Sequence, residues 1–162
     1  WGTSRWLTTA RTHNLPQMVS IQNEYSLLCR LFDLDMAELS HHENIGLLSY
    51  SPLAAGLLSG KYADGTTPTG TRRSINADLG GRINEHLWPA LNGYLDIAER
   101  HELDPCQMAL AWAATRPFIT SQIIGATSIT QLQTALESTN ITLSDAVMCD
   151  IQNNYRRYPM PF

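Results

Sequence analysis

Three short apolar runs, separated by longer helical patterns, constrain the fold of this chain more than any other feature. They are QMVSIQ (17–22), IGLLSY (45–50) and TSQII (120–124), and each has the length of a buried β-strand. The second run is apolar almost throughout, as is typical of a parallel sheet whose outer face is covered. Strands that alternate with helices form parallel βα units. We therefore predict an α/β fold with about three parallel strands.

Helical patterns fill most of the remaining sequence. The clearest is DPCQMALAWAATRP (104–117), in which Asp104 caps the helix, Pro105 lies in its first turn and Gln107 has capping-box spacing. Ser128 and Gln131 share that spacing. The predicted helices span 1–13, 33–43, 87–101, 104–117, 129–138 and 144–155. Residues 51–84 have no sustained periodicity, and a loop of this length in a compact domain is usually functional.

A parallel sheet of three strands would have two open edges. These edges would present unpaired N–H and C=O groups, and parallel sheets are normally buried. The chain of 162 residues is long enough for one domain with a real core. The sheet therefore either continues in sequence outside this chain or is completed when chains pair.

Composition argues against several classes of function. The formal net charge is −4 and no run of Lys or Arg occurs, which disfavours a nucleic-acid partner. No apolar stretch reaches the ~18 residues of a membrane span. The three cysteines lack CxxC spacing, so we expect neither a disulfide framework nor a zinc site. The N-terminus has no signal-peptide pattern, and we expect a cytoplasmic location.

Polar and aromatic residues follow each predicted strand, where function collects in βα architectures. Gln22 ends the first strand, and its amide suits a planar amide-bearing ligand such as a nicotinamide. Tyr50 ends the second strand, and its ring can stack on a flat heterocycle. The loop SPLAAGLLSGK follows, where glycines allow close backbone approach and Lys61 offers a charge for phosphate. The sequence GATS follows the third strand at a helix N-terminus that favours an anion.

Together these three strand ends predict one extended ligand with a flat ring and phosphates. Each feature alone also has a structural explanation, such as a packed tyrosine or an ordinary helix cap. Arg72 and Arg73 in the long loop could bind a 2′-phosphate or could simply be solvated. His41, His42 and Glu43 are adjacent and so splay apart on a helix, which does not favour a metal site.

The sequence resembles the aldo-keto reductases in three motifs. These are QNEYSLL (22–28), YSPLAAGLLSGKY (50–62) and IIGATSITQL (123–132), which match the C-terminal half of that family in order and spacing. The resemblance is greatest to bacterial reductases related to the voltage-gated potassium channel beta subunits. It implies that residues 1–162 are the C-terminal portion of a (β/α)8 barrel that binds NADP(H) without a Rossmann fold.

The resemblance also implies roles for individual residues. Gln22 would hold the nicotinamide carboxamide and Tyr50 would stack on its ring. Arg72 or Arg73 would close over the cofactor. The pyrophosphate would follow Ser51, Leu53, Gly56 and Lys61, and the adenosine 2′-phosphate end would lie near Gly125, Thr127 and Gln131.

Two departures from the family pattern matter. Ala135 stands where the family commonly has an asparagine near the adenine, and Thr134 where an acidic residue is frequent. The family's catalytic Asp, Tyr, Lys and His lie on earlier strands, before the part that this chain matches. Since such a barrel takes about 250 residues, we expect the N-terminal catalytic half to be absent and the segment to be inactive alone.

Three functional hypotheses follow. The first is the cofactor-binding half of an NADPH-dependent reductase of small aldehydes and ketones, and the second is a nucleotide-sensing or interaction subunit similar to the potassium channel beta subunits. The third is a half-barrel that dimerises to close its sheet.

Overall fold

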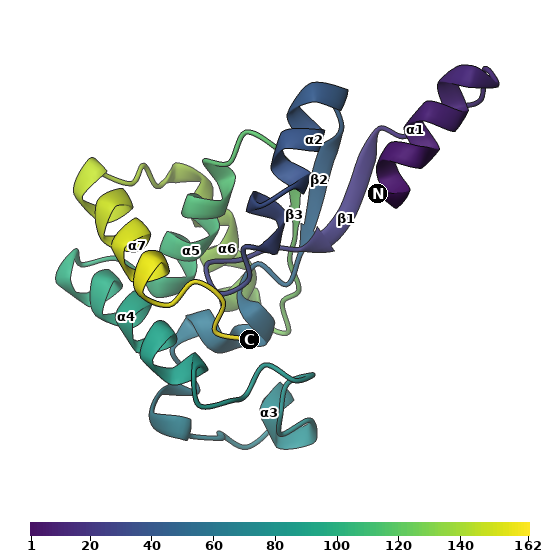
Figure 1. Ribbon diagram of the computed structural model, residues 1–162. Helices are drawn as coiled ribbons and strands as arrows, with labels where there is room; N and C mark the ends of the chain where they lie inside the picture. The colour runs from purple at the N-terminus through teal and green to yellow at the C-terminus, as the bar shows by residue number, and fades with distance from the viewer.

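The computed structural model describes residues 1–162, which form a small parallel sheet with helices gathered mainly on one side (Figure 1). The strands are β1 (Ser20–Glu24), β2 (Gly46–Tyr50) and β3 (Ile119–Ile123). The helices are α1 (Gly2–Thr12), α2 (Met36–Glu43), α3 (Arg72–Ile75), α4 (Leu87–Arg100), α5 (Pro105–Ala114), α6 (Ile129–Glu137) and α7 (Asp145–Arg157). Short 3₁₀ turns occur at Leu31–Asp33, Ala54–Ser59, Ala63–Gly65 and Ser138–Asn140. None of the helices combines the length with the apolar character that a membrane span requires.

The sheet has the strand order β1-β2-β3, and both pairings are parallel. Glu24 at the end of β1 lies opposite Tyr50 at the end of β2, which in turn lies opposite Ile123 at the end of β3. The three strands therefore end at one edge of the sheet. The predicted α/β fold with three parallel strands is confirmed, and its arrangement fits part of a (β/α)8 barrel.

The two faces of the sheet differ in burial. Leu47 and Ser49 on β2 are fully buried, and Gln122 on the same face donates from Nε2 to the Leu110 carbonyl of α5 at 3.0 Å. Because alternate residues of a strand point to opposite faces, Gln22, Tyr50 and Ile123 lie on the other face, and all three are exposed. We call this second surface the open face.

Gly46 and Thr120 meet on adjacent strands near the start of β2. A Cβ atom at position 46 would collide with the Thr120 hydroxyl, and the register between β2 and β3 shifts between Leu47 and Leu48. The absence of a side chain at Gly46 therefore lets β3 approach β2 beside this irregularity.

The core lies between the covered face of the sheet and helices α4, α5 and α7. Its central side chain is Trp112, whose ring stacks on that of Tyr25 with a centroid distance of 5.5 Å. The guanidinium of Arg30 lies 5.0 Å from the Trp112 centroid and donates through Nε to Asp33 at 2.7 Å. Burial, and then the Asp33 carboxylate, raise the pKa of Tyr25, which donates its hydroxyl proton to Asp33 at 2.7 Å.

The predicted helix caps are present. The Asp104 carboxylate accepts from the Gln107 backbone N–H at 2.9 Å, and Pro105 is the first residue of α5. The Gln107 side chain does not complete a reciprocal capping box, because it donates to Glu137 instead. The hydroxyl of Ser144 accepts from the Val147 N–H at 3.3 Å and starts α7.

Several predicted boundaries were wrong by a few residues. The first strand does not end at Gln22 but continues to Glu24, because Asn23 and Glu24 pair with Ser49 and Tyr50. The second helix begins at Met36 rather than at 33, after a 3₁₀ turn. On the first helix, Trp6 is 49% exposed, while Leu7 and Ala10 are buried.

Candidate functional site

The ends of β1 and β2 bring two of the predicted site residues onto the same face. Gln22 lies opposite Leu48, and Tyr50 lies opposite Glu24, so the amide and the aromatic ring both belong to the open face. Tyr50 is 38% exposed. An exposed ring beside an exposed amide can receive a flat, amide-bearing heterocycle.

The chain makes a tight turn with unusual backbone conformations directly after Tyr50. Ser51, Ala54 and Ala55 have positive φ angles of 52°, 47° and 57°, and Gly56 follows with a φ of 94°. A residue with a side chain normally avoids this region, at a cost of about 1–2 kcal/mol. Strain of this kind is found where the surrounding structure fixes it, and it gathers at ligand-binding sites.

The lysine that follows this turn folds back over it. A Cβ atom at Gly56 would lie 2.8 Å from both Cε and Nζ of Lys61, so the lysine chain passes directly over the glycine backbone. The ammonium lies 5.1 Å from the centroid of the buried Tyr62 ring. Lys61 itself is exposed, and its charge is available to a ligand phosphate.

The two loop arginines, which the sequence did not distinguish, differ in the structure. The backbone N–H of Arg73 donates to the Tyr62 hydroxyl at 3.4 Å. Its guanidinium donates to the Thr66 carbonyl at 2.7 Å and packs over the Trp88 ring. Arg72 on α3 is exposed, and its side chain makes no hydrogen bond or ion pair. Arg72 is thus the guanidinium that a ligand can recruit without breaking existing contacts.

The third strand end leads into α6 through an ordered turn. The Gln131 side-chain oxygen accepts from the Thr127 backbone N–H at 3.0 Å and from the Thr127 hydroxyl at 3.2 Å. Ser128 caps α6 by accepting from the Gln131 N–H at 3.2 Å. Gly125 has open space around its Cα, and all four residues are exposed. This helix start is ordered, exposed and suited to an anion.

The residues present fit an extended cofactor with a flat ring and phosphates. An amide and an aromatic ring share the open face, a strained turn carries a lysine, and an unpaired arginine and an exposed helix start complete the donor set. Leu53 is half-buried and packs against the core, so it supports the turn through its side chain. The structure holds no cluster of three or more His, Cys, Asp or Glu suited to a metal ion.

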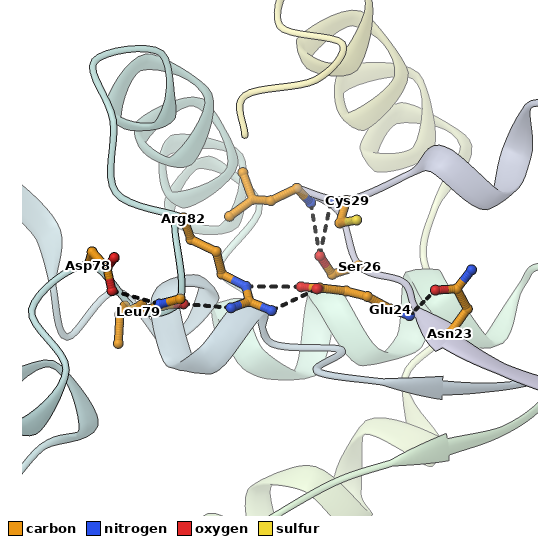
Figure 2. Close-up of polar contacts among 9 residues, drawn as sticks. Asn23, Glu24, Ser26, Cys29, Asp78, Leu79 and Arg82 are labelled. Carbon is orange, nitrogen blue, oxygen red and sulfur yellow. Dashed lines mark hydrogen bonds and ion pairs between the residues drawn. The ribbon is translucent and has the colours of Figure 1, made fainter.

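One feature of the site was missed by sequence reasoning. Arg82, in the second half of the long loop, makes a two-pronged ion pair with Glu24 at the end of β1 (Figure 2). Glu24 stood in the quoted motif QNEYSLL, but nothing local to Arg82 indicated its partner, because the two residues are far apart in the sequence.

A hollow of about 340 Å³ lies at the other end of the sheet. Its lining includes Val19, Gly46 and Thr120, at the amino ends of the strands. Ligands of open parallel sheets bind at the carboxyl ends. We therefore place the candidate site at the carboxyl ends of the strands.

Cys29 and Cys106, which lie near the site, are expected to be unreactive, whereas Cys149 is expected to react. Burial, and then the Asp104 carboxylate, raise the pKa of Cys106 to about 11, and burial raises the pKa of Cys29. Cys149 on α7 is exposed.

At pH 7.5 the Cys106 thiolate is rarer than about one in a thousand, so Ellman's reagent should react first with Cys149. Cys149→Ser should remove the fast phase and Cys106→Ser should leave it; a fast phase that persists in Cys149→Ser would contradict this assignment.

Comparison with known proteins identifies the family. The model of the aldo/keto reductase family matches residues 2–156. The chain belongs to the aldo/keto reductase family. It is 42% identical to Protein tas of Escherichia coli over 161 residues, which cover 99% of this chain and 46% of that protein.

Two other relatives are less similar to this chain. An aldo-keto reductase of Babesia bovis is 36% identical over 139 residues, covering 82% of this chain and 49% of the relative. A probable voltage-gated potassium channel subunit beta of Arabidopsis thaliana is 29% identical over 153 residues, covering 87% and 47%. This aldo/keto reductase chain therefore spans about half the length of the curated relatives it matches.

Proposed function

We propose that this chain supplies the cofactor-binding part of an NADP(H)-dependent oxidoreductase that reduces small aldehydes and ketones in the cytoplasm. The observation that carries the proposal is the alignment of Gln22 and Tyr50 on one open face, with the strained turn and Lys61 directly beyond Tyr50. Family membership supports oxidoreductase chemistry.

Each group in the site has a defined task in this proposal. The Gln22 amide binds the carboxamide, and the Tyr50 ring stacks on the nicotinamide. Ser51, Leu53 and Gly56 form the backbone surface along which the pyrophosphate lies, with Lys61 and Arg72 balancing its charge. Gly125, Thr127 and Gln131 surround the phosphate at the adenosine end. When bound, the reduced cofactor supplies the hydride for the carbonyl carbon.

The proton donor belongs to another part of the protein in this proposal. The resemblance implies an Asp, Tyr, Lys and His on earlier strands of the barrel, and none of these roles is assigned to residues 1–162. We therefore propose that this chain is the C-terminal portion of the barrel and that it binds the cofactor without turning over a carbonyl by itself.

The test is to complete the barrel. This chain is co-expressed with the part of Protein tas to which it does not align, giving a complex that we call the complemented enzyme. We expect NADPH oxidation with a panel of aldehydes, and none from either part alone. Lys61→Met should raise KM for NADPH by roughly 10- to 100-fold, as loss of one charge-assisted contact implies. A folded complex that binds NADPH poorly and oxidises none of it would refute the proposal.

A second candidate is a nucleotide-sensing or interaction subunit. It is favoured by the relatives named as potassium channel beta subunits, in Arabidopsis thaliana and in Oryza sativa, and by Ala135 at the half-buried position on α6 where adenine contacts are expected. In that case the complemented enzyme would bind NADPH tightly without measurable turnover. The two candidates are thus separated by one assay that measures binding and oxidation together.

A further inference from the structure

The residue that follows β1 holds the backbone of Tyr50. The backbone N–H of Tyr25 donates to the Tyr50 carbonyl at 3.3 Å, one residue beyond Glu24, the last paired residue of β1. This carbonyl belongs to the peptide bond that leads into Ser51, which has a positive φ of 52°. The Tyr50 carbonyl therefore lies between the strand and the strained turn, and the position of Tyr25 helps to set where it is held.

The ring of Tyr25 is fully buried and contacts two other rings. It stacks on Trp112 with an interplanar angle of 10° and meets Phe118 edge-on at a centroid distance of 5.3 Å. The stabilisation that comes from burying apolar surface is non-directional. These two contacts alone would therefore let the ring slide along the face of Trp112. Its position along that face is set by the hydroxyl.

The hydroxyl of Tyr25 bonds to a buried ion pair. It donates to Oδ1 of Asp33 at 2.7 Å, while Oδ2 of Asp33 accepts from Nε of Arg30 at 2.7 Å. Arg30 is only 6% exposed, and its guanidinium lies 5.0 Å from the Trp112 centroid and 3.7 Å from the Tyr155 centroid. A hydrogen bond has a preferred length and angle. The ion pair therefore fixes the far end of the Tyr25 ring, and the ring in turn fixes its backbone N–H.

A buried ion pair contributes little net stability to a core. Apolar residues of the same volume often stabilise a core as well or better, because both charges lose their hydration on burial. What the Asp33–Arg30 pair adds is a fixed geometry for the tyrosine. We propose that Tyr25 is a positioning residue, which holds the Tyr50 carbonyl so that the Tyr50 ring meets the nicotinamide in one orientation. The nicotinamide rests on the proposed function, whereas the hold on Tyr50 rests on the contacts themselves.

Tyr25→Phe in the complemented enzyme tests this role, because the substitution removes only the hydroxyl. In single turnovers with NADPH and an aldehyde, we expect hydride transfer to slow roughly ten-fold, since a displacement of about 1 Å can cost about 100-fold. NADPH should bind several-fold more weakly, because its ring stacks less well on Tyr50. Adenosine 2′,5′-bisphosphate, which has no nicotinamide, should bind with unchanged affinity. A general loosening of the fold would instead weaken both ligands equally, and that result would overturn the positioning role.

Tyr94→Phe is the matched control. Tyr94 on α4 is buried as well, but its hydroxyl does not bond to Asp33 or to Arg30. The substitution removes the same atom from the core without touching the hold on Tyr50, so hydride transfer and both affinities should stay unchanged. Thermal unfolding of each variant checks that the fold is kept. Equal rates of hydride transfer in Tyr25→Phe and in the wild-type enzyme would overturn the proposal.

Hydrogen exchange tests the hold on Tyr50 without any cofactor. The N–H of residue 25 is protected by its bond to the Tyr50 carbonyl. Its exchange, followed by NMR in the cofactor-free complemented enzyme, should be roughly ten-fold faster in Tyr25→Phe, as loss of a hydrogen bond to a charged group implies. If exchange responds but neither form binds NADPH, the proposed function fails and the hold on Tyr50 stands. If this N–H exchanges at the same rate in both forms, the hold itself is refuted.

Discussion

Gly56→Ala is expected to weaken NADPH binding to the complemented enzyme roughly 10-fold or more. A methyl group at this position would lie 2.8 Å from Cε and Nζ of Lys61, so the flexible lysine must leave the backbone over which it now folds. Displacing its ammonium removes a charge-assisted contact worth about 1.5–3 kcal/mol. The positive φ of 94° adds a strain of about 1–2 kcal/mol to the cost in stability. Fluorescence titration measures the affinity and urea unfolding the stability.

Gly65→Ala separates these two effects. Gly65 has a similar positive φ of 75°, but a Cβ atom there would meet nothing within 4 Å. We expect the same loss of stability as for Gly56→Ala and an unchanged affinity for NADPH. If the two variants bind NADPH equally well, Lys61 does not contact the phosphates from its position over Gly56.

Trp112→Ala is expected to cost about 3–5 kcal/mol of unfolding free energy. Trp112 is 1% exposed, stacks on Tyr25 and lies beneath the guanidinium groups of Arg30 and Arg116, at 5.0 and 5.1 Å from its centroid. The substitution leaves a large cavity and removes both cation–π contacts. Since a domain of this size is stable by only about 5–15 kcal/mol, the variant should unfold at a much lower urea concentration.

Trp6→Ala provides the comparison for this loss. Trp6 is 49% exposed on α1, and its removal should change the unfolding free energy by no more than about 0.5 kcal/mol. A similar loss of unfolding free energy in both variants would show that the core around Trp112 does not dominate the stability of the chain.

The elements with local signals were predictable from the sequence. Helix starts were predictable because a cap and its first turn lie within a few residues of each other. The structure has helices at the starts predicted from Asp104 with Pro105, from Ser128 and from Ser144. The boundary of β1 was not predictable, because its last two residues are strand only through pairing with β2. The identity of the inner face of α1 likewise depends on what packs against it.

The candidate site was likewise predictable only where its residues belong to a local sequence motif. Gln22, Tyr50 and Lys61 were identifiable because each belongs to a continuous motif that follows a strand. The left-handed turn at Ala54 and Ala55 gave no signal, since alanine has no preference for positive φ and the surrounding loop imposes it. The contact between Glu24 and Arg82 depends on where the long loop returns, and loop paths are not encoded by short-range periodicity.

Gly46 and Thr120 limit the size of each other's side chain. Any side chain at position 46 would collide with the Thr120 hydroxyl, and threonine has little freedom to turn away because it is branched at Cβ. A lineage can therefore enlarge position 46 only after, or together with, a reduction at position 120. A recombinant that combines a larger residue at position 46 with Thr120 should therefore fold poorly, even when each strand comes from a stable relative.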